Sequence, residues 1–175
     1  IADGYRGRVY LSPEPTVLAE YQRLLDDDRA LNNELSELRG QPTETTDGVV
    51  VPLNLNTGLV SDLGETGVKE SDGVGLYRTE LPFMVRDGFP AEVVQIANYR
   101  AVLKAFHPRP VVLRTLDHGG DKPFHYFPIT ESNPFLGWRG ILVSLDHPEI
   151  FLTQIRAILR DDIVLHNKKI MLPIN

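Results

Sequence analysis

The chain has 175 residues, of which 42% are apolar and 24% charged, a composition typical of a soluble globular domain with a sizeable core. It contains no cysteine, which excludes disulfides and thiolate ligands and fits a cytoplasmic location, and its net charge of −6 argues against a general nucleic-acid binder. No apolar run approaches the length of a membrane span. Because no start methionine precedes Ile1, we expect the chain to be a piece of a longer polypeptide.

The first forty residues predict a short strand at residues 8–11 and then one long helix. Ser12 and Pro13 are typical of a helix start, and Gly40 and Pro42 of a helix end, so we expect a helix over about residues 13–39. Its apolar side chains recur at alternating spacings of four and three residues, and the acidic residue Asp28 interrupts them. This stripe comprises Val17, Tyr21, Leu24, Leu31, Leu35 and Leu38. Two interpretations remain open: the stripe packs on its own domain, or the helix links two domains or dimerises.

From Gly48 onward, apolar runs typical of strands alternate with segments of helical spacing. We expect strands at residues 49–55, 74–77, 111–113 and 169–174, and helices at about 59–69, 90–106 and 146–160. Asp146 is expected to cap the last helix, with Pro148 in its first turn and Glu149 at the capping-box position. Residues 141–144 fit either a strand or a first helical turn. The alternation predicts an α/β fold with a parallel sheet, either a small open sheet or half of a (β/α)₈ barrel.

Two arginines come directly after predicted strands, and a third follows the long irregular segment of residues 116–138. Arg78 follows the strand at 74–77, Arg114 follows the strand at 111–113, and Arg139 follows Trp138. Ligands of parallel sheets bind at the carboxyl ends of the strands, so these side chains should meet at one rim. A guanidinium group binds phosphate or carboxylate through two parallel bonds. The sequence therefore predicts a pocket for a small anion of several charges.

Each arginine also has a purely structural interpretation. Arg78 could pair with Glu80, Arg114 with Asp117 or Asp121, and Arg139 could stack on Trp138. The glycine pair after His118 could offer backbone N–H groups to an anion or form a plain turn. The five histidines lack metal-ligand spacing, although His118 and His125 lie in the long segment and could reach a ligand.

Three segments resemble enzyme I of the bacterial phosphotransferase system. Gly73–Glu80 is similar to its G-x-G-L-x-R-T-E segment, Leu113–Lys122 to its R-T-x-D-x-G-x-D-K segment, and Asn133–Arg139 to its N-P-x-L-G-x-R segment. The flanks Leu81–Met84 and Gly88–Pro90 are more similar to the nitrogen-related paralogue than to the sugar-transport enzyme.

The resemblance implies a domain organisation. Residues 1–12 are similar to the C-terminal tail of the phosphohistidine domain, and residues 13–47 to the linker helix and its connection. Residues 48–175 are similar to the N-terminal half of the (β/α)₈ barrel that binds phosphoenolpyruvate (PEP). The fold expected from the resemblance is therefore α/β, half of a TIM-type barrel preceded by a long helix.

The resemblance also implies an activity. Enzyme I moves the phosphoryl group of PEP to its own histidine with Mg²⁺ and passes it to a carrier protein. Arg78, Arg114 and Arg139 match arginines that bind PEP. The motifs add supporting polar residues, namely Thr79, Glu80, Asp117, Asp121, Lys122 and Asn133.

Other parts of the enzyme I pattern have no match in this sequence. The phosphorylated histidine, the Mg²⁺ carboxylates and the cysteine that protonates the enolate are expected outside this chain. We therefore expect no catalytic residue and no metal ligand in this chain, and we expect the chain to be inactive alone. We also expect a homodimer or another partner to cover its exposed apolar surface. The alternatives are part of a PEP-utilising dikinase or synthase, or a non-catalytic module that senses PEP or dimerises.

Overall fold

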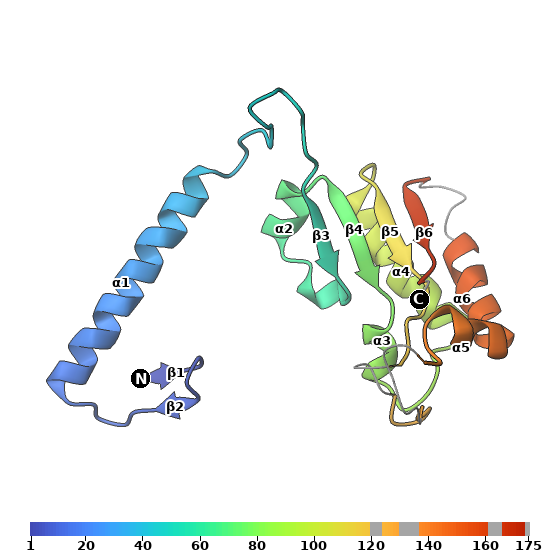
Figure 1. Cartoon of the computed structure of the whole chain (residues 1–175), viewed down its shortest axis with the longest axis horizontal. Helices are drawn as coiled ribbons and strands as arrows, with labels where there is room; N and C mark the ends of the chain where they lie inside the picture. The colour runs from blue at the N-terminus through green and yellow to red at the C-terminus, as the bar shows by residue number, and fades with distance from the viewer. Residues whose placement is uncertain (120–123, 130–136, 161–165, 174–175) are drawn as a thin grey trace. The chain divides into compact units, whose positions relative to one another are not determined.

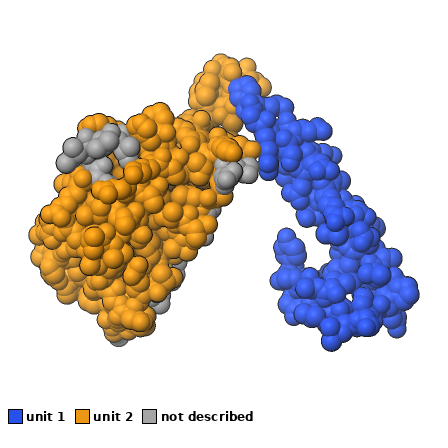
Figure 2. Space-filling view, turned by 180° about the vertical axis from the view of Figure 1, so that it is seen from behind, with its two compact units in different colours: residues 1–42 blue, residues 43–175 orange. Residues whose placement is uncertain are grey.

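The structure is a computed structural model, and it describes residues 1–119, 124–129, 137–160 and 166–173. The chain divides into two compact units, Ile1–Pro42 and Thr43–Asn175 (Figure 2). No helix within these described ranges is both long enough and apolar enough to cross a membrane.

The first unit is a small hairpin followed by one long helix. Strands β1 (Ala2–Asp3) and β2 (Arg8–Val9) pair antiparallel, and α1 spans Pro15–Glu37. The predicted start at Ser12 is wrong, because Ser12 has a φ of 46° and the helix begins at Pro15 after Glu14. No residue of α1 is buried, and the leucines of the predicted stripe are exposed.

The second unit contains a sheet of four parallel strands in the order β3-β4-β5-β6 (Figure 1). They are β3 (Asn54–Thr57), β4 (Gly73–Arg78), β5 (Val111–Arg114) and β6 (Lys168–Met171). Because all four strands run the same way, their carboxyl ends lie at one edge of the sheet. The α/β fold with a parallel sheet is thus confirmed.

The strand predicted at residues 49–55 is mostly wrong. Val49, Val50 and Val51 are exposed and fold back on the preceding residues, with the Thr45 N–H donating to the Val49 carbonyl at 2.9 Å. The turn at Asp47-Gly48, where Gly48 has a φ of 86°, reverses the chain, and Pro52 has no N–H for a sheet. The strand therefore begins only at Asn54.

Five helices of the second unit and one 3₁₀ turn lie within the described residues. They are the turn Val60–Asp62 and the helices α2 (Glu65–Glu70), α3 (Leu81–Met84), α4 (Glu92–Phe106), α5 (Ile141–Asp146) and α6 (Pro148–Arg160). The ambiguous residues 141–144 are helical. Asp146 does not cap α6 as predicted, because it is the last residue of α5 and accepts a hydrogen bond from the Trp138 indole N–H.

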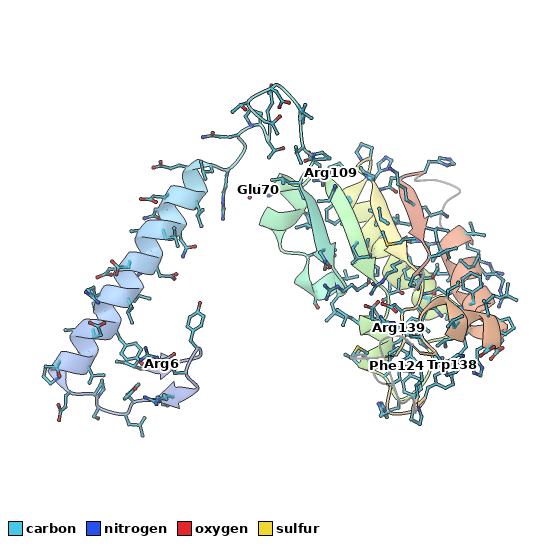
Figure 3. All side chains as sticks on the ribbon, in the orientation of Figure 1. Arg6, Glu70, Arg109, Phe124, Trp138 and Arg139 are labelled. Carbon is cyan, nitrogen blue, oxygen red and sulfur yellow. The ribbon has the colours of Figure 1, made fainter. Side chains whose placement is uncertain are left out.

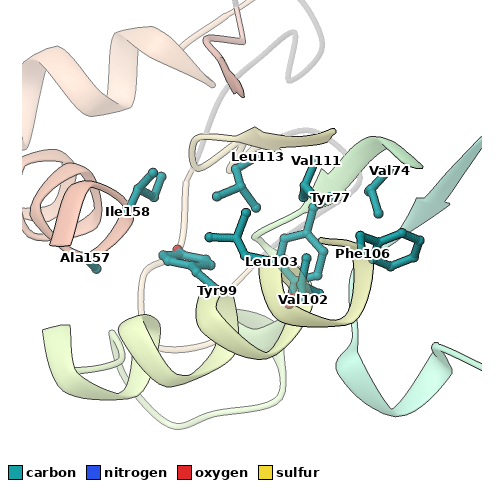
Figure 4. Packing of buried hydrophobic residues seen from close by; sticks show 10 residues of the cluster. All are labelled: Val74, Tyr77, Tyr99, Val102, Leu103, Phe106, Val111, Leu113, Ala157 and Ile158. Carbon is teal, nitrogen blue, oxygen red and sulfur yellow. The ribbon is translucent and has the colours of Figure 1, made fainter. Parts of the chain in front are cut away.

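The core lies on the face of the sheet that α4 and α6 cover (Figure 4). Val74 and Tyr77 of β4 and Val111 and Leu113 of β5 are buried there. Side chains alternate between the two faces of a strand, so Val112 and Arg114 belong to the opposite face. Alternation also places Met171 on that face, because it pairs in register with Arg114. Met171 is 41% exposed, so the described residues cover this part of the second face only partly.

Candidate functional site

Two of the three predicted arginines occupy neighbouring strand ends. Arg78 is the last residue of β4, Arg114 is the last residue of β5, and the two pair in register. In a parallel sheet, paired residues point to the same side. The structure therefore brings Arg78 and Arg114 to one rim, as the sequence predicts.

Arg114 is fixed by two carboxylates. Its Nη2 lies 2.5 Å from Glu80 Oε1, and its Nη1 lies 3.1 Å from Asp117 Oδ2. The Arg114 side chain is only 15% exposed, and those of Glu80 and Asp117 are 0% and 5% exposed. Such well-shielded, charge-assisted bonds hold the guanidinium group in one orientation.

Arg139 joins the same group through Asp117. Its Nη2 donates to Asp117 Oδ1 at 3.1 Å and to Oδ2 at 3.3 Å, and its side chain is 16% exposed. Arg139 lies at the end of the unit where α3 and α5 are found, at the opposite end from Arg109 (Figures 1 and 3). The result is a continuous ion-pair network, Glu80–Arg114–Asp117–Arg139.

The backbone around Gly119 allows Arg139 to come this close. Gly119 has a φ of 116°, and a Cβ there would lie 2.8 Å from the Arg139 Cβ. Next to Arg139, the Gly140 N–H donates to the His118 carbonyl at 3.1 Å. An anion-binding turn and a plain turn were the two predictions for the pair Gly119-Gly120; the structure gives Gly119 a packing role beside Arg139, and Gly120 lies outside the described residues.

Arg78 differs from the other two arginines because its side chain is exposed. It lines a cleft of about 520 Å³ together with Asn56, Thr57 and Leu81. Among the described residues it makes no ion pair, so the predicted pairing with Glu80 is not seen; Glu80 binds Arg114. Arg78 is therefore the cation of this rim with the most freedom to meet an anion.

Thr79 ties the two strand ends together through the backbone. Its hydroxyl donates to the Arg114 carbonyl at 2.7 Å and accepts a hydrogen bond from Gln154 Nε2 at 3.1 Å. Gln154 also accepts the Leu116 N–H at 2.8 Å. Gln154 is absent from the predicted site residues, although a polar residue between Phe151 and Ile158 on an apolar helix face was a usable signal.

The side chains of the two histidine candidates make other contacts. The His118 ring is buried, stacks on Phe124 at 4.1 Å, and has its Nε2 at 2.8 Å from the Phe127 carbonyl. His125 is exposed, with its Nε2 at 3.1 Å from Asp87 Oδ1. These contacts explain His118 as part of an aromatic cluster and His125 as a surface residue.

The remaining candidates, Asp121, Lys122 and Asn133, lie outside the described residues. Within the described ranges, no group of three or more histidine, aspartate or glutamate side chains is placed to hold a metal ion. Glu80 and Asp117, the carboxylates closest to the arginines, are already bound to guanidinium groups and do not fit a Mg²⁺ ligand set.

Comparisons with known proteins agree on one family of enzymes. Residues 32–174 match a family model described as PEP-utilising enzyme, PEP-binding domain. The chain is 47% identical over 173 residues to a protein of Escherichia coli (strain K12) named phosphoenolpyruvate-dependent phosphotransferase system, and the match covers 99% of the chain and 23% of that protein.

Two further relatives carry the name phosphoenolpyruvate-protein phosphotransferase. That of Staphylococcus carnosus (strain TM300) is 44% identical over 161 residues, which is 91% of the chain and 28% of the relative. That of Bacillus subtilis (strain 168) is 42% identical over 176 residues, which is 99% of the chain and 30% of the relative. The chain thus spans between 23% and 30% of the length of these relatives. The chain belongs to the PEP-utilising enzymes, and it carries their PEP-binding domain.

Proposed function

We propose that the arginines at these strand ends bind PEP in a phosphotransferase that moves the phosphoryl group to its own histidine and then to a carrier protein. The observation that carries this proposal is the arrangement of Arg114, which lies in register with Arg78 and is joined to Arg139 through Asp117. The names of the relatives favour this activity over that of a dikinase or synthase.

The chemistry of PEP suits this arrangement. PEP carries a phosphate and a carboxylate, and phosphoryl transfer depends mainly on positioning and on neutralising charge. A guanidinium group has five N–H donors, and the ion pairs to Glu80 and Asp117 use only part of those on Arg114. The carboxylates therefore orient Arg114 and Arg139 while leaving donors for substrate, and exposed Arg78 adds a positive charge that no carboxylate among the described residues pairs with.

The proposal assigns each part of the chain a place in the complete protein. Residues 1–12 would end the phosphohistidine domain, residues 13–47 would form the linker helix and its connection, and residues 48–175 would form the first half of a (β/α)₈ barrel. The parallel sheet with helices on one face supports the half barrel, and the 23-residue helix α1 supports the linker. We further propose a homodimeric, cytoplasmic protein of the nitrogen-related branch, on the strength of the Leu81–Met84 and Gly88–Pro90 flanks.

Mg²⁺ would neutralise charge on the phosphoryl group during transfer. Since Glu80 and Asp117 are committed to arginines, we propose that its ligands come from a part of the protein outside this chain. Within the chain, the contribution is substrate binding and orientation by Arg78, Arg114 and Arg139. Thr79 and the carboxylates, together with Asp121, Lys122 and Asn133, would support these arginines.

The test is substitution of Arg114 in the complete protein. Arg114→Ala should lower the rate of phosphorylation by radiolabelled PEP by about 10²–10³-fold, because a preorganised donor to the transferring group is lost. Arg114→Lys should recover only part of this rate, since lysine cannot reproduce the fork. Arg156→Ala is the control, because Arg156 is a surface arginine of α6 paired with Glu92.

Wild-type rates in Arg114→Ala would refute the proposed site. A requirement for nucleotide in the phosphorylation of the wild-type protein would favour a dikinase or synthase. Tight binding of PEP to this chain without Mg²⁺, measured by calorimetry, would favour the non-catalytic sensor.

A further inference from the structure

Three polar side chains lie buried in the apolar core behind the carboxyl ends of β4 and β5. Gln95 and Tyr99 belong to α4 and are 3% and 2% exposed, and Gln154 belongs to α6 and is 0% exposed. A buried polar group lowers stability unless it is hydrogen-bonded, and a similar apolar side chain would fill the same space. Their hydrogen bonds therefore indicate what these side chains contribute.

Gln154 uses all of its amide groups except one acceptor position. Its Nε2 donates to Thr79 Oγ1 and to the Tyr99 hydroxyl oxygen, both at 3.1 Å, and its Oε1 accepts the Leu116 N–H at 2.8 Å. If the amide were flipped, its NH₂ group would face the Leu116 N–H, and two donors would meet. The surroundings therefore specify one orientation of the Gln154 amide.

Both hydroxyl groups that accept a hydrogen bond from Gln154 donate one to a further acceptor. The Tyr99 hydroxyl donates to Gln95 Oε1 at 3.0 Å, and Gln95 Nε2 donates to the Pro90 carbonyl at 2.9 Å. Burial raises the pKa of Tyr99, so its hydroxyl keeps the proton that it donates. On the other side, the Thr79 hydroxyl donates to the Arg114 carbonyl at 2.7 Å.

These bonds converge on one short stretch of backbone. Gln154 holds the Leu116 N–H directly and the Arg114 carbonyl through Thr79, so it fixes the peptide groups on both sides of Thr115. The Thr115 N–H donates to the Met171 carbonyl of β6 at 2.9 Å. The backbone that carries Arg114 and leads to Asp117 is therefore held from two sides.

We propose that Gln154 is a positioning residue for the PEP site, which sets the orientation of Arg114 and Asp117 without touching the substrate. This inference rests on the proposed function. A displacement of about 1 Å in a group that orients substrate can lower the reaction rate by a large factor. Loss of the Gln154 amide should therefore lower the rate of phosphorylation by more than the loss of folded protein explains. Tyr99 completes the arrangement by accepting the second Gln154 N–H.

The experiment compares variants of the complete protein in phosphorylation by PEP over a range of PEP concentrations. Gln154→Met keeps the approximate shape and removes every hydrogen bond, and it should lower kcat/KM at least about tenfold. Tyr99→Phe removes the hydroxyl that accepts from Gln154 and donates to Gln95, and it should lower kcat/KM about threefold. Both effects are compared after correction for the folded fraction measured by urea unfolding.

Asn167→Leu is the matched control. Asn167 is also buried, and its Nδ2 donates to the Leu103 and Arg109 carbonyls at 3.1 and 2.9 Å. It lies just before β6, and its backbone carbonyl accepts the Val111 N–H at the amino end of β5, away from Arg114 and Arg139. A variant at this position should lose stability but keep a wild-type kcat/KM per folded molecule.

The outcomes separate the two proposals. If wild-type protein is phosphorylated by PEP and Gln154→Met loses no more kcat/KM than Asn167→Leu, the positioning role is refuted while the proposed function stands. If wild-type protein is not phosphorylated by PEP, both are refuted. If Gln154→Met does not fold, Tyr99→Phe decides, because a wild-type kcat/KM in that milder variant also refutes the positioning role.

Discussion

Asp117 determines how close Arg114 and Arg139 can come to each other. Two guanidinium groups repel, yet both lie against this one carboxylate at 3.1 Å and are about equally shielded from solvent. A shared carboxylate converts that repulsion into two attractions and still leaves N–H donors on both arginines. The same carboxylate would bring the two arginines toward one anion.

Asp117→Asn should therefore lower the free energy of unfolding by roughly 2–3 kcal/mol, because it leaves two shielded positive charges without their shared partner. Urea unfolding of the chain measures this change. Sulfate should restore more stability to the variant than to the wild type, since the anion can take the place of the lost carboxylate between the two guanidinium groups. Asp87→Asn is the control because Asp87 is fully exposed, and equal stability of the two variants would contradict the role given to Asp117.

Gly119 provides a second test of how the site is built. The Cβ of an alanine there would lie 2.8 Å from the Arg139 Cβ, and its backbone would need a φ of 116°, which residues other than glycine rarely adopt. In the complete protein, Gly119→Ala should weaken phosphorylation by PEP about tenfold or more, since strain of about 1–3 kcal/mol falls beside Arg139. Gly88→Ala is the control, because a Cβ there meets nothing within 4 Å. Equal rates in the two variants would show that the Gly119 contact is unimportant.

Among the elements, the strands were predictable where local signals agreed. Val111–Arg114 is an apolar, β-branched run after a proline, and it forms β5. The run Val49–Val51 is also apolar and β-branched, but it lies between the Asp47-Gly48 turn and Pro52, and these flanking residues keep it out of the sheet. Apolar content alone therefore does not identify a strand, because the flanking residues must also allow the run to join the sheet.

The position of Arg78 and Arg114 at neighbouring strand ends was predictable in the same way, because it follows from the local strand pattern. Their role in binding a ligand stays a prediction. Gln154 lies 75 positions from its partner Thr79, and the ion pair of Arg139 spans 22 positions. Sequence periodicity does not predict such contacts, because they depend on how α6 and residues 137–140 pack in the folded unit.

The contact between the hairpin and α1 should depend on pH. Asp3 accepts hydrogen bonds from the Tyr21 hydroxyl at 2.6 Å and from the Arg6 N–H at 3.0 Å, and these bonds lower the pKa of Asp3 below its ordinary 3.8. Because the folded pKa is the lower one, the contact stabilises the hairpin above the ordinary pKa. That stabilisation is lost as the pH falls through the lowered pKa.

The NMR shifts of the Tyr21 ring and of the Ala2–Val9 pairing should therefore change together on acidification. Asp3→Asn should abolish the pH dependence of these shifts in the acidic range. The turn at Asp47, whose pKa is also lowered by its bond from the Thr45 hydroxyl, serves as an internal reference in the other unit. An unchanged Tyr21 shift through this range would exclude the contact.

At the scale of the whole molecule, each unit exposes apolar surface among its described residues. The first is the leucine stripe of α1, in which Leu24, Leu31, Leu35 and Leu38 are between 47% and 60% exposed. The second is the sheet face opposite α4 and α6, which carries Val112 and Met171. Exposed apolar surface of this kind favours association, so the chain alone should not be a stable monomer.

Sedimentation velocity over a range of concentrations should show reversible self-association of the chain. If the sheet face is responsible, as the half barrel predicts, Met171→Lys should weaken association because it places a charge on that face, and Leu31→Lys should leave it unchanged. The reverse result would assign association to α1 and support the alternative of a dimer seam. A monodisperse monomer at every concentration would count against the half barrel itself, because an open barrel wall with an uncovered inner face should not persist alone in water.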